Sequence, residues 1–393
     1  MNRRYRRFGL LILAALASLG CGGSQSSTSP PGGSPSPCFS PQPGYIYLDR
    51  DAIFVANTGS SSISAFQLVG PIEGPAAGPV CGSPFHVDAP PTALAGGILF
   101  QTGLLVLSQS GKSIAMYSVD YLTSALTGPR FTVTTAYTPV AVAGWRSFFY
   151  VANLEDSVSA FQVAPDGKSA TEIPGSPFPA GAGPAALAAA DQPGLLYVAN
   201  SQSNNVSGYN LDPSTGVPTP LPGSPYPVGD GPAWVVVDPA AGPNPFGPRL
   251  VIVSNNLSNN ASVFSVAGDG SLSPVPGSPF PAGEAPSSAA TADGFPLKFA
   301  YVSNSQSNDI SGYSIDNATG ALTPLAGSPF PAGTLPSSIA MAANGNFVYV
   351  ANAGSNSLSV DAVVQGGALM PVAGSPFPVG QSPRALLYFE VPQ

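Results

Sequence analysis

The chain has 393 residues, only 8% of them charged, and a formal net charge of −8 at pH 7. Glycine and proline number 45 and 46, but 44% of the chain is hydrophobic, which is enough to bury a core and argues against low-complexity disorder. The few cations are scattered and cannot form the basic footprint that phosphate binding needs, so we expect no nucleic-acid partner.

Residues 1–20 are predicted to be a lipoprotein signal peptide. The basic segment MNRRYRR precedes the apolar segment FGLLILAALASLG, which is too short to span a membrane, and Cys21 follows. This order resembles a bacterial lipoprotein signal, in which the cysteine becomes the lipidated first residue, although Ser18 stands where leucine is usual. A secretory peptide cut near Cys21 without lipid, or a single-pass anchor, are the alternatives. Lipidation would place the protein in the cell envelope, anchored in a membrane and either periplasmic or surface-exposed.

Residues 21–44 are rich in Ser, Pro and Gly and carry no aliphatic side chains, so we expect a disordered tether. If Cys21 carries lipid, Cys38 and Cys81 are an even pair in an exported chain, which predicts a disulfide between them. Two unrelated thiols are the alternative. No His or Cys partners lie close enough in sequence to suggest a metal site.

Residues 45–393 repeat a unit of about 49 residues seven times. One recurring motif is an apolar strand ending in Asn, and it occurs as FVAN (54–57), a decayed LVLS (105–108), YVAN (150–153), YVAN (197–200), IVSN (252–255), YVSN (301–304) and YVAN (349–352). The second motif is GSPFPAG or a variant, and it begins at residues 82, 175, 223, 277, 327 and 374, with a decayed GPRF at 128–131. Each of the two independent motifs therefore occurs seven times, once in every unit.

Each unit contains four short strands, which in one unit cover residues 287–292, 299–304, 310–315 and 322–331. Seven such units predict an all-β fold, a seven-bladed β-propeller with four antiparallel strands per blade. The small residues of the first strand suit the crowded centre of the ring. The prolines of GSPFP suit the outermost strand because proline cannot donate to a strand ladder, and the phenylalanine between them is expected to pack back onto the blade.

Two segments compete to close the ring. RALLYFEV (384–391) follows the last GSPF motif where an innermost strand belongs, and we expect it to join the first blade. The alternative places YIYL (45–48) there and leaves the C-terminal segment outside.

These motifs, together with the D…TG turns at 212–216 and 316–320, resemble the YVTN-type and lactonase-like propellers. That superfamily includes 6-phosphogluconolactonases of the propeller type. The resemblance covers residues 45–391 and implies the fold, with lactone hydrolysis as an activity that could accompany it. The matching residues are structural ones, and a fold does not by itself imply a function.

The loops that join fourth to first strands and second to third strands share one face of the ring, where a functional site is expected. Asp230 and Glu284 occupy equivalent junction positions in successive units. Two such carboxylates could form a catalytic acid–base pair or help to hold Ca²⁺, although no cofactor is otherwise expected. Two solvated surface acids are the alternative.

Three other residue types were weighed. The sole histidine, His86, lies on an outer strand, where an exposed variant is favoured over a catalytic base. Trp234 could stack on a carbohydrate, with core packing as the alternative. The asparagines that end the YVAN strands could form a polar ring, but bonding of their side chains to the backbone at turns is favoured.

The sequence favours an envelope-anchored, monomeric propeller that acts as a binding or scaffolding module for a protein or carbohydrate partner. A hydrolase of a sugar lactone is the alternative. A phosphorylated lactone would need several cations for its phosphate and a base to activate water. The chain offers one histidine and widely spaced Arg and Lys residues, which is why the binding module is preferred.

Overall fold

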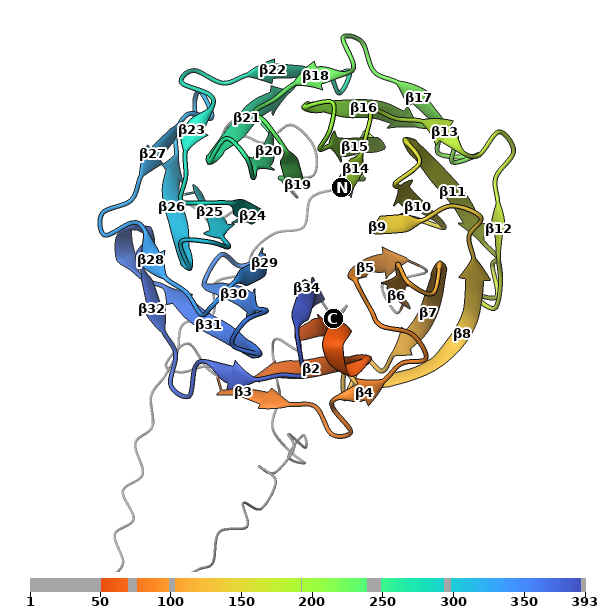
Figure 1. Ribbon diagram of the computed structural model, residues 1–393, viewed down its shortest axis with the longest axis horizontal. Coiled ribbons are helices and arrows are strands. Elements are labelled where there is room, and N and C mark those ends of the chain that lie inside the picture. The colour runs from red at the N-terminus through yellow and green to blue at the C-terminus, as the bar shows by residue number, and fades with distance from the viewer. Residues whose placement is uncertain are drawn as a thin grey trace, which may run out of the picture. The chain divides into compact units, whose positions relative to one another are not determined.

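The computed structural model describes residues 51–69, 76–98, 103–191, 193–238, 249–292 and 298–389. Within these ranges the chain forms seven antiparallel sheets arranged as blades around a central axis (Figure 1). The predicted seven-bladed all-β propeller is confirmed. The predicted signal peptide, tether and YIYL segment lie outside the described residues, and so do Cys21 and Cys38.

Every blade orders its strands in the same way from the axis outward. The innermost strands are β5 (Ala93–Ile98), β9 (Pro139–Trp145), β14 (Pro184–Ala190), β19 (Pro232–Val237), β24 (Pro286–Ala292), β29 (Pro336–Met341) and β34 (Pro383–Phe389). The second strands are β1 (Ala52–Asn57), β6 (Gly103–Ser108), β10 (Phe148–Asn153), β15 (Leu195–Asn200), β20 (Leu250–Asn255), β25 (Lys298–Asn304) and β30 (Phe347–Asn352). The third strands are β2 (Ser62–Val69), β7 (Ser113–Val119), β11 (Ser157–Val163), β16 (Asn205–Leu211), β21 (Asn260–Val266), β26 (Asp309–Ile315) and β31 (Ser357–Val363).

The fourth position differs from the prediction of one continuous outer strand. In six blades it is divided into two short strands that both pair with the third strand. These pairs are β3 (Ala76–Pro79) and β4 (Phe85–His86), β12 (Ala170–Glu172) and β13 (Phe178–Pro179), β17 (Pro218–Pro220) and β18 (Tyr226–Pro227), β22 (Leu272–Pro274) and β23 (Phe280–Pro281), β27 (Leu322–Pro324) and β28 (Phe330–Pro331), and β32 (Leu369–Pro371) and β33 (Phe377–Pro378). The second blade alone has one long outer strand, β8 (Leu126–Thr134), and two short 3-10 helices, η1 (Thr58–Ser60) and η2 (Gln365–Gly367), complete the described elements.

The serine of the GSPF motif explains how the outer strand can be interrupted. Where the ladder stops, a backbone N–H of the third strand would lose its acceptor, which is costly for a buried group. The serine hydroxyl replaces that acceptor: Ser176 Oγ accepts from the N–H of Ala160 at 3.0 Å, and Ser328 Oγ accepts from Gly312 at 2.9 Å. The same bond recurs at Ser83, Ser224, Ser278 and Ser375.

The aromatic residue of the motif packs inward, as predicted. Tyr226, Phe280 and Phe330 are buried, and the equivalent residues of three other blades are partly buried against neighbouring clusters. The prolines lie on the outermost strands, as expected of a residue that cannot extend a ladder.

The C-terminal strand closes the ring. Strand β34 pairs antiparallel with β1, so the first blade is completed by residues from both ends of the described chain. Phe389 also packs edge-on against Phe54, with 5.8 Å between ring centroids. The preferred closure is therefore confirmed.

The hydrophobic core of the described chain lies between blades rather than within them. Seven buried clusters are present, and each draws its residues from two adjacent blades. Since each blade covers its neighbour, the ring buries its apolar faces only when it is closed. This explains why the clasp strand β34 contributes Leu386 to one cluster and Phe389 to another.

In three blades the tyrosine of the YVAN or YVSN motif links the blade to the next one. Tyr150, Tyr197 and Tyr301 donate their hydroxyls to the carbonyl oxygens of Gly216, Gly270 and Gly367 at 2.6–2.7 Å. These glycines lie in the turns after the third strands of the following blades. Burial raises the pKa of each tyrosine well above its ordinary value, so the phenol keeps the proton that it donates.

The asparagine that ends each YVAN strand does not bond mainly to a turn backbone, and that expectation was wrong. In six blades its side-chain amide is fully buried and donates to a serine of the adjacent third strand at 2.9–3.0 Å. We call each pair an Asn–Ser node; the pairs are Asn57–Ser64, Asn153–Ser159, Asn200–Ser207, Asn255–Ser262, Asn304–Ser311 and Asn352–Ser359. In the second blade Ser108 takes the place of the asparagine.

The last glycine of GSPFPAG is required by the same node. Gly181 donates its N–H to Ser207 Oγ at 3.3 Å, and Gly283 donates to Ser311 Oγ at 3.1 Å. A Cβ at Gly181 would lie 2.6 Å from Nδ2 of Asn200, closer than real side chains allow. The node therefore fixes the junction that leads into the blade, because only glycine lets that junction approach.

We expect Gly181→Ala to destabilise the protein by about 1–3 kcal/mol, as overpacking of a filled interior does. Gly268 is the matched control, since an added Cβ there meets nothing within 4 Å. Gly268→Ala should be neutral or stabilising by less than about 1 kcal/mol. Chemical denaturation of both variants measures the difference, and equal stabilities would contradict the role given to the node.

Asp361 in β31 is an unusual third-strand residue because it is only 6% exposed. The equivalent residues of two other blades are Tyr209 and Tyr313, whose hydroxyls donate to the carbonyls of Pro179 and Pro281. Desolvation raises the pKa of Asp361 from 3.8 to about 6. Between about pH 4 and pH 6, the folded protein thus keeps a proton on Asp361 that the unfolded chain has already lost.

Asp361 should therefore make stability fall as the pH rises from about 4 to 6, and its cost should be complete above that range. Asp361→Asn keeps the shape and removes the charge, so it should stabilise the protein by up to about 3 kcal/mol at pH 8. The two proteins should converge at about pH 3. Urea denaturation across this pH range tests the prediction, and a constant difference between the two would refute it.

Candidate functional site

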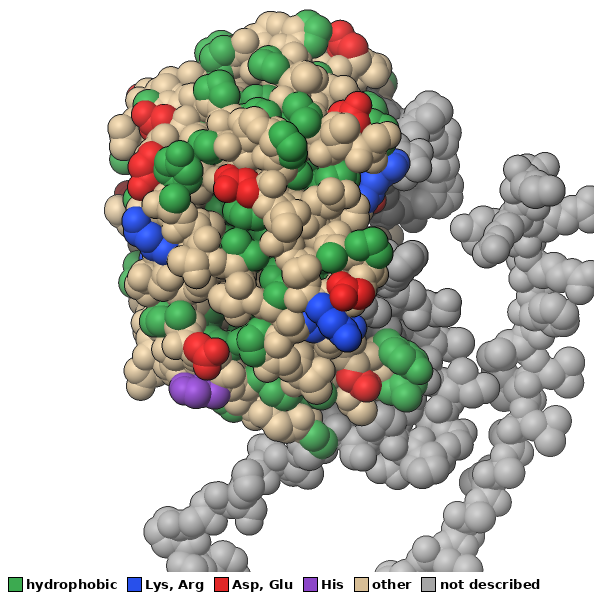
Figure 2. Space-filling view, turned by 90° about the vertical axis from the view of Figure 1, so that its right-hand side faces the viewer, with side chains coloured by type: hydrophobic (Ala, Val, Ile, Leu, Met, Phe, Trp, Pro, Cys, Tyr) green, Lys and Arg blue, Asp and Glu red, His purple; other side chains and the backbone are tan. Residues whose placement is uncertain are grey.

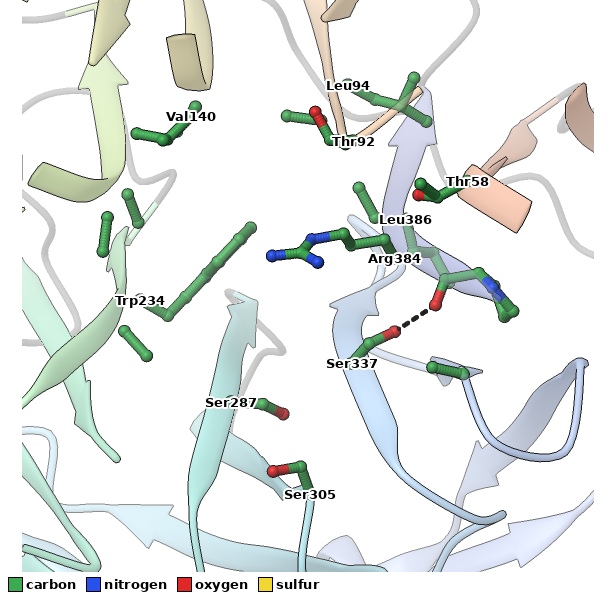
Figure 3. A pocket seen from close by; sticks show the side chains of 18 of the residues that line it. Thr58, Thr92, Leu94, Val140, Trp234, Ser287, Ser305, Ser337, Arg384 and Leu386 are labelled. Carbon is green, nitrogen blue, oxygen red and sulfur yellow. Dashed lines mark hydrogen bonds between the residues drawn. The ribbon is translucent and has the colours of Figure 1, made fainter. Parts of the chain in front are cut away.

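A pocket of about 490 Å³ lies where the innermost strands begin, around the axis of the ring (Figure 3). Its lining comes from the first residues of these strands, from the junctions before them and from residues just after the second strands, such as Thr58, Asn256 and Ser305. This is the face on which the sequence placed a functional site. We call this cavity the mouth pocket.

A β-bulge aims one residue from most blades into the mouth pocket. In β34, for example, Pro383 and Ala385 pair with the consecutive residues Asn57 and Ala56, so Arg384 is the extra residue between them. The same shift occurs at the start of five other innermost strands. Bulges of this kind redirect a side chain out of the regular ladder. We call the extra residues the bulge ring: Val140, Ala185, Ala233, Ser287, Ser337 and Arg384.

The polar part of the bulge ring is fixed by hydrogen bonds between blades. Ser287 Oγ donates to the carbonyl of Pro336, and Ser337 Oγ donates to the carbonyl of Pro383, both at 2.8 Å. Asn256 Nδ2 donates similarly to Pro286 at 3.2 Å. Because these donor hydrogens are engaged by the protein, the remaining lone pairs of the oxygens are suited to accept hydrogen bonds from a ligand.

Arg384 is the one ionisable side chain among the residues that line the mouth pocket. It is exposed, and Figure 3 shows its guanidinium directed toward the middle of the pocket, with the indole of Trp234 reaching in from the other side. A guanidinium supplies several donors and recognises a carbonyl oxygen or a carboxylate. The pocket thus combines one strong donor group, the Arg384 guanidinium, with the acceptor oxygens of Ser287, Ser337 and Asn256.

The structure does not bring Asp230 and Glu284 into the lining of the mouth pocket. Both side chains are exposed. Asp230 Oδ1 accepts from Asn204 Nδ2 at 3.0 Å, and the backbone N–H of Glu284 donates to Ser307 Oγ at 3.0 Å. Their proposed role as an acid–base pair stays a prediction.

The remaining candidate residues lie outside the polar part of the bulge ring. His86 is exposed on the outer strand β4. Trp234 is partly buried against two inter-blade clusters and also lines the mouth pocket, so packing and a ligand contact are compatible. Cys81 is in a disulfide, but Cys38 lies outside the described residues, so that pairing stays a prediction.

Sequence reasoning missed Arg384 as a site residue. It was counted among scattered cations, and no neighbouring charge marked it. The available signal was its position: directly after the junction proline, where aligned units carry Val140, Ala185, Ala233, Ser287 or Ser337. Only a comparison of equivalent positions separates this arginine from surface charges.

Two further features are absent from the described part of the chain. It contains no group of three or more His, Cys, Asp or Glu residues that could hold a metal ion. It also contains no helix long and apolar enough to cross a membrane. On the side of the ring in Figure 2, acidic and basic side chains lie dispersed among uncharged ones.

With this geometry established, comparison with known families assigns the chain. Residues 104–237 and 262–388 match the model of the lactonase family, described as a 7-bladed beta-propeller. The chain belongs to this lactonase family. No curated protein matches the chain in sequence.

Solved structures of similar shape include several lactonase-like propellers. A candidate 6-phosphogluconolactonase from Bacteroides fragilis is 17% identical, with a TM-score of 0.70, and the match covers 89% of this chain and 99% of that protein. The periplasmic gluconolactonase of Pseudomonas aeruginosa is 20% identical, with a TM-score of 0.66 over 87% and 99% of the two chains. The WD40 repeats of RRP9 reach 0.50 at 12% identity, over 88% and 96%. At these identities the similarity establishes the fold only.

Proposed function

We propose that this lactonase-family propeller binds a hydroxylated, unphosphorylated lactone in the mouth pocket and hydrolyses it. The observation that carries the proposal is Arg384, which extends into a pocket whose other polar groups present acceptor oxygens. Membership of the lactonase family and the likeness to a gluconolactonase favour this hydrolase over the binding module that the sequence alone favoured.

In the proposed reaction, the lactone carbonyl oxygen accepts hydrogen bonds from the Arg384 guanidinium. The oxygen of a water molecule attacks the carbonyl carbon, and negative charge develops on the carbonyl oxygen, where the guanidinium stabilises it. The bond between the carbonyl carbon and the ring oxygen then breaks, and the ring oxygen takes a proton and becomes a hydroxyl group. The product is a hydroxy acid, which releases one proton to solvent at neutral pH.

The substrate class follows from the polarity of the lining. Hydroxyl groups on the lactone can donate to the oxygens of Ser287, Ser337 and Asn256; the two serine hydroxyls already donate to the next blade, as does one N–H of Asn256. Trp234 offers an apolar face of the kind on which sugar rings stack. A phosphate group would call for further cations, whereas Arg384 is the one ionisable group in the lining.

We expect Arg384→Ala to lower kcat/KM for δ-gluconolactone by about 10²-fold, the usual cost of removing one oxyanion donor. Proton release from the purified full-length protein measures the rate above spontaneous hydrolysis. Arg130→Ala is the matched control, because Arg130 is exposed on the outer strand β8 and its loss changes the net charge equally. This control should retain full activity.

Two results would reject the proposed reaction. One is a wild-type rate equal to the spontaneous rate, and the other is an equal loss in the two arginine variants. If gluconate nevertheless quenches Trp234 fluorescence without any hydrolysis, the pocket serves binding alone, as the sequence first suggested. Trp145, the other tryptophan, is only 2% exposed and supplies a constant background.

We further propose that the propeller is held in the cell envelope by a lipid on Cys21, with residues 21–44 as a tether. The support is the order of basic, apolar and cysteine segments at the N-terminus. In a bacterial host fed a fatty-acid alkyne, the wild-type protein should carry the label and fractionate with membranes. Cys21→Ser should lose both properties, and Cys81→Ser should lose neither; a labelled Cys21→Ser protein would overturn the assignment.

A further inference from the structure

The bulge ring is polar on one side of the mouth pocket and apolar on the other. Serines and the arginine of the bulge ring come from the sixth, seventh and first blades, as Ser287, Ser337 and Arg384. The third and fourth blades contribute Val140 and Ala185 at the same positions. Figure 3 shows Val140 and Leu94 on the side of the pocket opposite Ser287 and Ser305.

The apolar side extends below the bulge ring. Leu94, Val142 and Leu187 line it from three successive blades, and Val142 and Leu187 are 6% and 8% exposed. At the same position the sixth and seventh blades carry Ala289 and Ile339, which do not line the pocket. The two sides of the pocket therefore differ in chemistry at the bulge positions, where their backbones are equivalent.

The volume of the pocket also indicates a ligand larger than one lactone ring. At about 490 Å³ it lies in the range of roughly 300–1,000 Å³ in which proteins enclose drug-sized ligands. One lactone ring beside Arg384 and the serines would leave the apolar side unfilled. Placing a fully hydroxylated ligand against that side would also bury hydroxyl groups without partners, which is unfavourable.

We infer that the ligand is amphipathic: a hydroxylated lactone, or the hydroxy acid formed from it, that also carries an alkyl chain. The carbonyl or carboxylate group contacts Arg384, and the chain lies against Val140, Leu94 and Leu187. This inference rests on the proposed function for the identity of the ring, but the division of the pocket into two halves is independent of turnover.

The test compares δ-decalactone, which carries an alkyl chain, with δ-gluconolactone, which carries hydroxyl groups instead. Val140→Ser is the informative variant because serine already occupies the same bulge position in the sixth and seventh blades, so the backbone tolerates it. It should lower kcat/KM for δ-decalactone by about tenfold relative to that for δ-gluconolactone, the usual effect of a lost apolar contact. Val140→Ile keeps the surface apolar and should retain the wild-type preference for δ-decalactone.

Binding of the ring-opened acids, followed by Trp234 fluorescence, separates this inference from the proposed function. If neither lactone is hydrolysed but 5-hydroxydecanoate binds more tightly than gluconate, and Val140→Ser removes that preference, the reaction is rejected and the ligand class stands. If δ-gluconolactone is hydrolysed in preference to δ-decalactone, or Val140→Ser lowers both rates equally, the ligand class is overturned while the reaction stands. Tighter binding of gluconate without any hydrolysis overturns both.

Discussion

The buried Asn–Ser nodes are the contacts on which the mouth of the propeller depends. Amide N–H groups left unpaired in the interior would be costly, so the bond from each asparagine Nδ2 to its serine holds the end of a second strand against the third. In four blades the serine also accepts the N–H of the junction glycine. That glycine lies a few residues before the proline and the bulge. Arg384 is therefore positioned through Asn57, which donates to Ser64, and through Ser64, which accepts from Gly380 four residues before Arg384.

The same construction separates the residues that make the fold from those that can make a site. The serine of GSPF and the Asn–Ser node each recur in six blades, and the tyrosine bond to the next blade occurs in three, all with almost the same distances. The bulge ring is held by this repeated frame but varies in chemistry from valine to arginine. Substitutions in the ring change what faces the pocket without removing a contact that the blades need, which is how one propeller frame can serve different ligands.

The sequence was sufficient to predict the seven-bladed propeller because two motifs each occur seven times. Prolines also indicated the outer strands, and small residues indicated the inner strands. It was insufficient where a side chain replaces a backbone group. Nothing in the letters GSPF shows that Ser328 would take over an acceptor from an interrupted strand, and the outer strand was therefore predicted as continuous. The asparagines were likewise assigned to turns, since the partner Ser207 of Asn200 is identified only by strand register.

The candidate site was harder to predict for a related reason. Asp230 and Glu284 attracted attention because they are two like residues at equivalent positions, and their side chains are exposed outside the pocket lining. Arg384 was overlooked because it is single. In a repeat protein the frame is repeated and the site is not, so a site residue is expected to be an exception among equivalent positions. An alignment of the seven units by the junction proline identifies Arg384 and Trp234 on that principle.

The charge of the whole molecule fits the chemistry of such a site. The chain carries 20 acidic and 12 basic residues, so its overall field disfavours the approach of anions. In the proposed reaction, the neutral lactone would be unaffected by that field, whereas the carboxylate formed on ring opening would be attracted by the Arg384 guanidinium and repelled by the rest of the protein. The balance favours release of product over its accumulation. A pocket with one arginine in an acidic propeller is thus better suited to stabilise charge that develops during a reaction than to retain an anion already formed.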